Sequence, residues 1–211
     1  FEKKKKINLL NEIKKLNIKK KNLLIIHQDR PSGLADAILQ TEKFLNKEDF
    51  CVILPDDLII GSNCTKQLIN IYNKKKTNVL GVMEVEKKDV SKYGIIDISS
   101  SKKNNYKIKS MIEKPSIKKS PTNLAIVGRY ILRNDIFGFI KKIKIGSGGE
   151  YQLTDALALS NKYFETWGYK FKGKRYDCGN KIGFLKAQIA VAFKDKEIKN
   201  DMIKFIKHLG D

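Results

Sequence analysis

The chain has 211 residues, enough for one domain with a substantial core, and 41% of them are hydrophobic, which excludes a disordered polypeptide. Its formal net charge of +20 comes mainly from lysines spread along the whole chain, and only four of its 43 basic residues are arginines. Because arginine is the residue that forks onto phosphates and bases, we expect nonspecific attraction to polyanions and no specific nucleic-acid partner. No apolar run reaches membrane-spanning length, so no membrane partner is expected.

The cysteines and histidines limit the possible metal chemistry. Cys51, Cys64 and Cys178 show no paired metal-ligand spacing, and their odd number fits a reduced, cytoplasmic protein best. His27 and His208 are the only histidines, which excludes a histidine-rich metal site. Any metal here must be a hard cation that carboxylates hold.

The first part of the chain alternates between helical and strand-like apolar patterns. In chain order these predict a helix over residues 7–20, a strand over 22–28, a helix over 33–46, a strand over 50–54, a helix over 64–76 and a strand over 78–85. Such alternation predicts a largely parallel sheet that is covered on both faces.

The pattern changes in the second part of the chain. Two consecutive strands over 93–99 and 106–113 predict an antiparallel hairpin. The remaining elements are expected to be a buried strand over 123–132, helices over 134–143 and 150–162, a strand over 163–173, and two helices from about 181 to 211. We therefore expect residues 1–211 to form one α/β domain with a mixed sheet.

Two adjacent acids follow the predicted strand 50–54, in the sequence VILPDDLII. In open α/β sheets ligands collect beyond the carboxyl ends of the strands, so Asp56 and Asp57 are well placed for a magnesium ion. Pro-Asp-Asp is also ordinary turn chemistry, and the residues alone favour neither interpretation. Asp177, between a predicted strand and a helix, is a second candidate ligand, although the motif alone favours Asp177 or Asn180 as a helix cap.

Several other positions could contact a nucleotide or a sugar. The amide of Gln28 can donate and accept at once, as uracil requires, and Gly33 would let the backbone approach a base or a ribose. Without further support, an ordinary strand–loop–helix connection is the better interpretation of these two. Gly94 would permit close approach of a ligand or a bulge. Glu150 and Asp155, in GSGGEYQLTDAL, are polar contacts for a ligand or favourable partners of a helix dipole.

An acid–base pair stands beside a proline in the sequence EKPSIKKSPTNLAIVGRY. Pro115 biases Lys114 toward an extended backbone, in which neighbouring side chains face opposite ways. Glu113 and Lys114 can therefore serve one ligand only if the strand ends or bulges at this point. The alternative is an exposed ion pair at a strand edge, which contributes little.

Six motifs occur in a fixed order from Asn22 to about Phe193: Q…GLADAI, VILPDD, YGIID, IEKP…PTNLAIVGRYIL, GGEYQLTDAL and DCGNKIG. Together they resemble the bacterial UTP–glucose-1-phosphate uridylyltransferases. PSNLAIVGRY and GGEIQLTDAI are close to diagnostic in that family, and here they read PTNLAIVGRY and GGEYQLTDAL.

This resemblance implies a Rossmann-like nucleotide-diphospho-sugar transferase fold, with a mixed, mostly parallel sheet flanked by helices. It implies that UTP and glucose 1-phosphate react to give UDP-glucose and pyrophosphate, with Mg²⁺ as cofactor. By motif match Asp56 is the metal ligand and Asp177 a second metal or polar contact, and Asp56 and Lys114 are the catalytic residues. The match places Gln28 and Gly33 at the uracil and ribose, and it places the glucose 1-phosphate at Gly94, Glu113, Lys114 and, less directly, Glu150.

The chain departs from the family pattern in two places. The family usually has Gly-Leu-Gly-His-Ala where this chain has Gly33-Leu34-Ala35-Asp36-Ala37, and an acid in place of histidine could alter nucleotide affinity. The glycine-rich GxGTRxxPxTK segment that wraps the triphosphate in the family does not occur in this sequence. We therefore expect a fragment and not a degenerate protein, and we expect little uridylyltransferase activity from residues 1–211 alone.

Other functions compete with this interpretation. One alternative is another sugar-1-phosphate nucleotidylyltransferase, for example one that uses dTTP. Another is a metal-dependent glycosyltransferase, in which the acid pair would bind a ready-made nucleotide sugar. A third is a basic polyanion-binding protein without an active site. Release of pyrophosphate from UTP and glucose 1-phosphate separates these functions. For the uridylyltransferase that the resemblance implies, we also expect a homo-oligomer.

Overall fold

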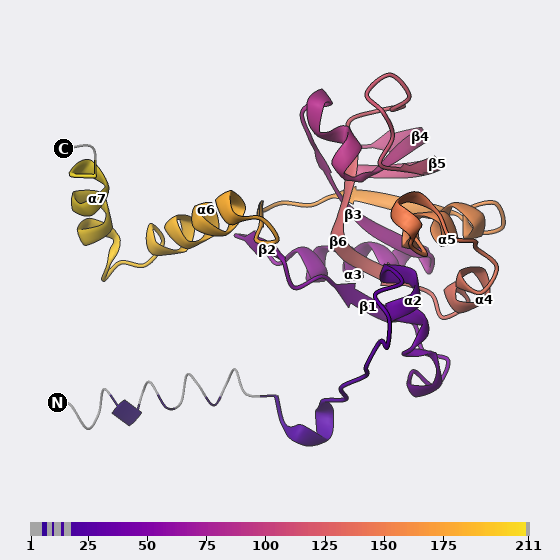
Figure 1. Ribbon diagram of the computed structural model, residues 1–211, viewed down its shortest axis with the longest axis horizontal. Coiled ribbons are helices and arrows are strands. Elements are labelled where there is room, and N and C mark those ends of the chain that lie inside the picture. Colours follow the sequence, from indigo (N-terminus) through magenta and orange to yellow (C-terminus); the bar gives the residue numbers. More distant parts are fainter. Residues whose placement is uncertain (1–5, 8–9, 11–13, 15–17, 210–211) are drawn as a thin grey trace. The chain divides into compact units, whose positions relative to one another are not determined.

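The computed structural model describes residues 6–7, 10, 14 and 18–209 (Figure 1). The chain divides into two compact units, Phe1–Arg30 and Pro31–Asp211. In the first unit the helix expected over 7–20 lies mostly outside the described residues, which include a 3₁₀ helix, η1 (Lys20–Asn22).

The strand expected over residues 22–28 is wrong. These residues take no regular structure after η1, and the side chains of Leu23, Leu24 and Ile25 are exposed. An isolated strand has little stability, because its backbone groups need a neighbouring strand as hydrogen-bond partner. The described strand pairings contain no such partner for this segment.

A six-stranded mixed sheet forms the centre of the second unit, in the order β1-β6-β3-β7-β5-β4. Its strands are β1 (Phe50–Ile53), β3 (Asn78–Glu84), β4 (Gly94–Lys102), β5 (Asn105–Glu113), β6 (Leu124–Leu132) and β7 (Thr166–Lys170). β3 and β7 run parallel, whereas β1 and β6, β6 and β3, β7 and β5, and β5 and β4 pair antiparallel.

The predicted mixed sheet is confirmed, but the expectation that it is mostly parallel is wrong. Alternating helical and apolar segments do not fix the direction of a strand, because a connecting loop can return the chain in either sense. Residues 114–123 illustrate this, since they lead from β5 to β6, which enters the sheet antiparallel between β1 and β3. β6 is buried along its length apart from the half-buried Arg129, which explains its continuous apolar sequence.

Helices cover both faces of the sheet, as expected. On one face α2 (Leu34–Leu39), α4 (Ile136–Ile140) and α5 (Leu153–Ser160) pack in a core that includes Leu80. On the other face α3 (Cys64–Lys75) packs in a core that includes Val79. Successive residues of a strand point to opposite faces, so β3 supplies side chains to both cores.

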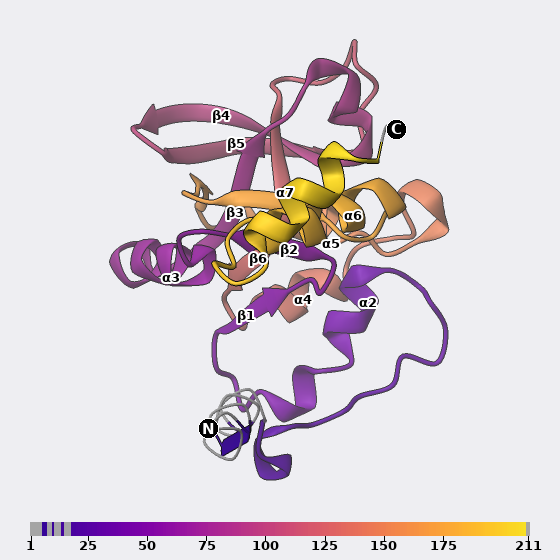
Figure 2. The same ribbon diagram turned by 90° about the vertical axis from the view of Figure 1, so that its left-hand side faces the viewer.

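The other described elements lie around this sheet. β4 and β5 form the predicted hairpin, and they lie side by side at the top of Figure 2. β2 (Asp57–Ile60) and β8 (Lys174–Asp177) form a separate antiparallel pair. The predicted C-terminal helices are α6 (Lys181–Ala192) and α7 (Lys199–Lys207), and the short 3₁₀ helices are η2 (Glu42–Phe44), η3 (Lys87–Lys92) and η4 (Ser147–Gly149). None of the helices in the described ranges is long and apolar enough to cross a bilayer.

Candidate functional site

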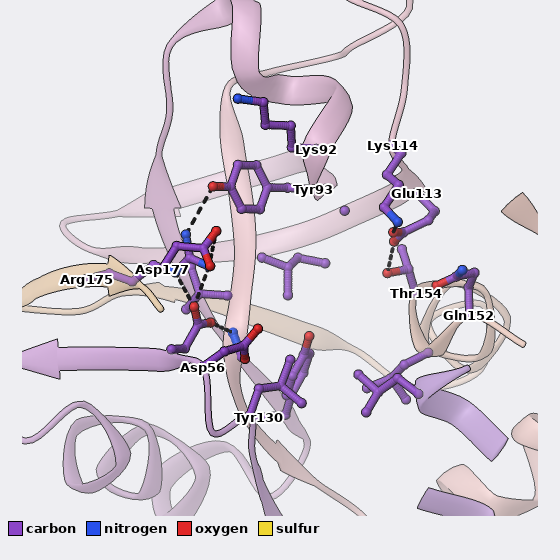
Figure 3. A pocket seen from close by; sticks show the side chains of 18 residues that line it. Asp56, Lys92, Tyr93, Glu113, Lys114, Tyr130, Gln152, Thr154, Arg175 and Asp177 are labelled. Carbon is purple, nitrogen blue, oxygen red and sulfur yellow. Dashed lines mark hydrogen bonds and ion pairs between the residues drawn. The ribbon is translucent and has the colours of Figure 1, made fainter. Parts of the chain in front are cut away.

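A cleft of about 340 Å³ opens in the second unit where several strand ends and the starts of two helices, α2 and α5, meet (Figure 3). The turn after β1, the junction of η3 and β4, the end of β5, the middle of β6, the start of α5 and the end of β8 all contribute to its lining. Its polar side chains are those of Asp56, Asp57, Lys92, Tyr93, Glu113, Lys114, Tyr130, Gln152, Thr154, Arg175 and Asp177. Figure 3 shows the acidic residues on the left of the cleft and the Glu113–Lys114 pair on the right.

The structure brings Asp56 and Asp177 together on the acidic side. β2 and β8 pair so that Asp57 lies directly opposite Asp177, which places Asp56 beside the turn after β8. A methyl group on Gly179 would lie 2.9 Å from Asp56 Oδ2 and 3.2 Å from Asp177 Oδ1. The two carboxylates therefore converge on the space above Gly179, and any side chain at position 179 would fill this space.

The helix cap expected at Asp177 or Asn180 belongs to Asn180. The Asn180 side chain accepts a hydrogen bond of 2.7 Å from the backbone N–H of Gly183, in the first turn of α6. Asp177 instead accepts a hydrogen bond of 3.0 Å from the backbone N–H of Gly179, and its side chain is 34% exposed. Because Asn180 caps the helix, the Asp177 carboxylate remains accessible from the cleft.

Asp57 has a different environment from its neighbour Asp56. Its side chain is 3% exposed, one carboxylate oxygen accepts hydrogen bonds from Arg175, and the other accepts from the backbone N–H of Gly128. Its carbonyl oxygen also accepts a hydrogen bond of 2.8 Å from Arg129. The carboxylate of Asp57 is thus bound within the protein, whereas Asp56 is exposed.

Arg175 connects the acidic side of the cleft to Tyr93. Its Nη1 donates a hydrogen bond of 3.1 Å to the Tyr93 hydroxyl, and its Nη2 lies 3.7 Å from Asp177 Oδ2. Burial lowers the pKa of Arg175, but the charge of Asp57 and the hydrogen bonds to Tyr93 and Asp57 outweigh it, so that the pKa lies above its usual value. The guanidinium is therefore a fixed cation.

Glu113 and Lys114 both reach the cleft because β5 ends at Glu113. Lys114 has a left-handed backbone with φ of 45°, so the extended conformation expected before Pro115 is wrong. The left-handed turn is held by a hydrogen bond of 3.0 Å from the Lys114 N–H to the Tyr93 carbonyl. Since the strand stops here, the two side chains need not face opposite ways, and Lys114 Nζ lies 4.0 Å from Glu113 Oε1.

A hydrogen bond fixes the Glu113 carboxylate. Thr154 Oγ1 donates to Glu113 Oε2 at 2.6 Å, from the first turn of α5. A methyl group on Gly94 would lie 2.9 Å from this hydroxyl and 3.1 Å from Glu113 Oε2, so glycine leaves the space for their contact. At the base of the cleft, burial and then the charge of Glu113 raise the pKa of Tyr130, whose phenol remains neutral.

Three of the residues expected in the site do not line this cleft. Gly33 has a φ of 106° and packs against the backbone of Tyr151, where an added methyl group would lie 2.7 Å from the Tyr151 oxygen. Glu150 accepts a hydrogen bond of 3.1 Å from Gln152 and stands beside Gly33. Gln28 belongs to the first unit, where its side chain is half-buried. Their roles toward a nucleotide or a sugar stay predictions.

Sequence reasoning missed several residues that line the cleft, among them Tyr93, Gln152, Thr154 and Arg175. The motif GGEYQLTDAL contains two of them, Gln152 and Thr154, but charge alone singles out its acids, Glu150 and Asp155. Asp155 turns away toward Gly146, and burial raises its pKa.

Asp36, which replaces the family's histidine, accepts a hydrogen bond of 3.1 Å from Gln40 and lines a separate hollow.

The donor set of the acidic side suits a hard divalent cation. Among the residues that the structure describes, no three His, Cys, Asp or Glu side chains form a metal cluster. Mg²⁺ commonly uses one or two carboxylates and completes its shell with water and substrate phosphates. The two converging carboxylates of Asp56 and Asp177 fit that mode of binding.

Known proteins of similar sequence and structure are nucleotidyl transferases. The model of the family described as Nucleotidyl transferase matches residues 2–193. The UTP–glucose-1-phosphate uridylyltransferase of Staphylococcus haemolyticus is 41% identical over 190 residues, which are 90% of this chain and 66% of that protein. The chain therefore spans slightly less than two thirds of that relative's length.

Two further relatives extend the comparison over nearly the whole chain. The enzyme of the same name from Bacillus subtilis is 37% identical over 213 residues, which cover 99% of this chain and 72% of that protein. The structure of a UTP-bound UGPase from Acinetobacter baumannii superimposes with a TM-score of 0.83 at 30% identity, and covers 99% of this chain and 73% of that one. The chain belongs to the nucleotidyl transferase family, among the UTP–glucose-1-phosphate uridylyltransferases.

Proposed function

We propose that the protein transfers a uridylyl group from UTP to glucose 1-phosphate, which gives UDP-glucose and pyrophosphate. The observation that carries this proposal is one cleft with a pair of converging carboxylates on one side and a Glu–Lys pair on the other. These two sides offer separate places for a cation with its phosphates and for a sugar phosphate. The names of the relatives support the choice of UTP and glucose 1-phosphate.

The reaction needs no nucleophile from the protein. A phosphate oxygen of glucose 1-phosphate attacks the α-phosphorus of UTP in line, and pyrophosphate leaves. Because two anions must meet, catalysis consists mainly of positioning and charge neutralisation. Lys114 offsets the charge of the sugar phosphate as a point cation. Glu113, oriented by Thr154, accepts hydrogen bonds from the sugar hydroxyls.

Asp56 and Asp177 would hold the Mg²⁺ ion. When bound, the ion supplies neutralisation of the charge that develops on the phosphate oxygens. Asp57 does not take part directly, because Arg175 and the Gly128 N–H already occupy its carboxylate.

The direct test is release of pyrophosphate from UTP and glucose 1-phosphate, measured, like all turnover below, on a protein that also carries the glycine-rich triphosphate segment. The rate with UTP should be higher than the rate with dTTP. With UDP-glucose and a sugar acceptor, no glucose should be transferred. Faster turnover with dTTP would favour the thymidylyl alternative, and transfer from UDP-glucose would favour a glycosyltransferase. Calorimetric titration of the 211-residue chain with UDP-glucose tests the sugar-nucleotide site independently of turnover.

Lys114→Met is expected to lower kcat/KM for glucose 1-phosphate at least about tenfold, because a charge-assisted hydrogen bond contributes roughly 1.5–3 kcal/mol. The KM for UTP should change much less. The Lys114 side chain is 47% exposed, so the melting temperature should barely move. Steady-state kinetics with each substrate varied in turn provide the measurement. Lys118→Met, on the same loop, is the control, and a large loss of melting temperature with unchanged kinetics would make Lys114 structural.

Thr154→Val should raise the KM for glucose 1-phosphate about fivefold, since loss of a hydrogen bond worth about 1 kcal/mol frees the Glu113 carboxylate to turn. The control is Thr122→Val, which removes a hydrogen bond of 2.6 Å to the carbonyl of Ile96 and one of 3.0 Å from the backbone N–H of Leu124. The control should lose at least as much stability as Thr154→Val, but only Thr154→Val should change this KM. Equal KM values in the two variants would separate Thr154 from the sugar site.

We also propose that the protein acts in a reducing, cytoplasmic compartment as a homo-oligomer. Its three cysteines are free, which is usual where thiols stay reduced. Sedimentation velocity tests the second part, because a single chain has a mass of 24.2 kDa.

A further inference from the structure

Three carboxylates and one guanidinium meet on the acidic side of the cleft. Asp57 and Asp177 lie opposite each other across the β2–β8 pair, and Arg175 stands two residues before Asp177 on β8. Residues two apart on a strand point to the same face, so Arg175 and Asp177 both reach the cleft. The guanidinium is fixed on two sides, by the Asp57 carboxylate and by the Tyr93 hydroxyl.

We propose that Arg175 is a positioning residue that holds the Asp177 carboxylate beside Asp56, ready for a divalent cation. The proposal rests on the proposed function, which assigns the cation to Asp56 and Asp177. Its geometric basis is the distance of 3.7 Å between Arg175 Nη2 and Asp177 Oδ2, from a guanidinium that its other partners keep in place. Asp57 and Tyr93 thus hold the Arg175 guanidinium in place, and the guanidinium in turn holds the Asp177 carboxylate.

The charges of the cluster agree with this role. Asp57 is almost completely buried, and a buried carboxylate needs a partner with excellent geometry. Arg175 supplies that partner and neutralises Asp57. Three carboxylates against one guanidinium leave two negative charges, on the exposed Asp56 and the partly exposed Asp177, which is the charge that one divalent cation balances.

A simpler role for Arg175 would be to satisfy Asp57 alone. The double variant Arg175→Met/Asp57→Asn separates the two roles, because it removes one positive and one negative charge together. The net charge of the cluster stays the same, and no buried carboxylate is left without a partner. If Arg175 served only Asp57, this variant would bind a cation as the unmodified protein does.

The experiment is a titration of the 211-residue chain with Mn²⁺ alone, in which electron paramagnetic resonance reports the free ion, beside a thermal melt of each variant. Arg175→Met/Asp57→Asn should bind Mn²⁺ about tenfold more weakly, as is usual when a residue that orients a metal ligand is lost. Binding within twofold of the unmodified protein would overturn the proposal. Asp56→Asn provides the reference for loss of the site itself.

Two further outcomes keep this test decisive. If Asp56→Asn binds Mn²⁺ as tightly as the unmodified protein, the assignment of the cation fails, and the positioning role falls with it. If the double variant does not fold, Tyr93→Phe replaces it, because this change removes only the hydroxyl that accepts from Arg175. We expect Tyr93→Phe to weaken Mn²⁺ binding about threefold, and unchanged binding would overturn the proposal.

Discussion

Asp56→Asn is expected to reduce turnover at ordinary Mg²⁺ concentrations at least about a hundredfold while the fold stays intact. A neutral amide is a poorer ligand for a hard cation than a carboxylate, and loss of a direct ligand should exceed the 10- to 100-fold effects of residues around it. Asp56 is exposed, so the change should cost little stability. The measurement is the rate of pyrophosphate release as a function of Mg²⁺, beside a thermal melt.

Asp201→Asn serves as the matched control, because Asp201 is exposed on α7 and does not line the cleft. It should leave both the rate and the melting temperature unchanged. Turnover of Asp56→Asn close to that of the unmodified protein at limiting Mg²⁺ would remove Asp56 from the metal site.

The position of the Asp56–Asp57 pair was predictable from the sequence, but the separate environments of the two residues were not. The order of apolar strand, turn and two aspartates placed both acids at a strand end, and the DCGN motif placed Asp177 at another. Sequence alone could not tell which member of the pair is exposed and which is buried. That choice depends on Arg175, which is 118 residues from Asp57 in the chain and meets it only because β2 pairs with β8.

The side of the cleft that carries Glu113 and Lys114 was also predictable in part. Glu113, Lys114 and Gly94 come together as expected, because the β4–β5 pairing places Gly94 opposite Glu113. The left-handed backbone of Lys114 was not predictable from the bias that Pro115 imposes, since a tertiary hydrogen bond to Tyr93 holds it. Thr154 was not predicted, because an uncharged hydroxyl in a motif does not by itself indicate a contact with a ligand or with Glu113.

The fold was predictable where the pattern was local and not where it depended on distant pairing. Helix α3, strand β6 and the β4–β5 hairpin occupy almost the expected residues, since their apolar periodicity is strong. The direction of the strands was not predictable, because it depends on where each connection returns the chain. Residues 22–28 have the composition of a strand, but composition supplies no hydrogen-bond partner.

Asp57→Ala is expected to destabilise the protein by about 3 kcal/mol, the lower end of the range for breaking a buried ion pair. The change leaves the guanidinium of Arg175, which is 11% exposed, and the backbone N–H of Gly128 without their carboxylate partner. Arg175 keeps Tyr93 and Asp177 as neighbours, which is why the loss should not reach the upper end. For a chain of this size the melting temperature should fall by about 6–12 °C.

The neighbouring change Asp56→Ala gives the sharpest comparison, because it removes the same group one residue away from an exposed position. It should alter the free energy of unfolding by less than about 0.5 kcal/mol. The two variants should therefore show opposite profiles, with Asp56→Ala stable and without Mg²⁺-dependent turnover, and Asp57→Ala unstable. Urea unfolding of both variants measures the difference. Equal stability of the two would mean that the Asp57–Arg175 pair contributes nothing to the fold, and that Asp57 is available to the cation after all.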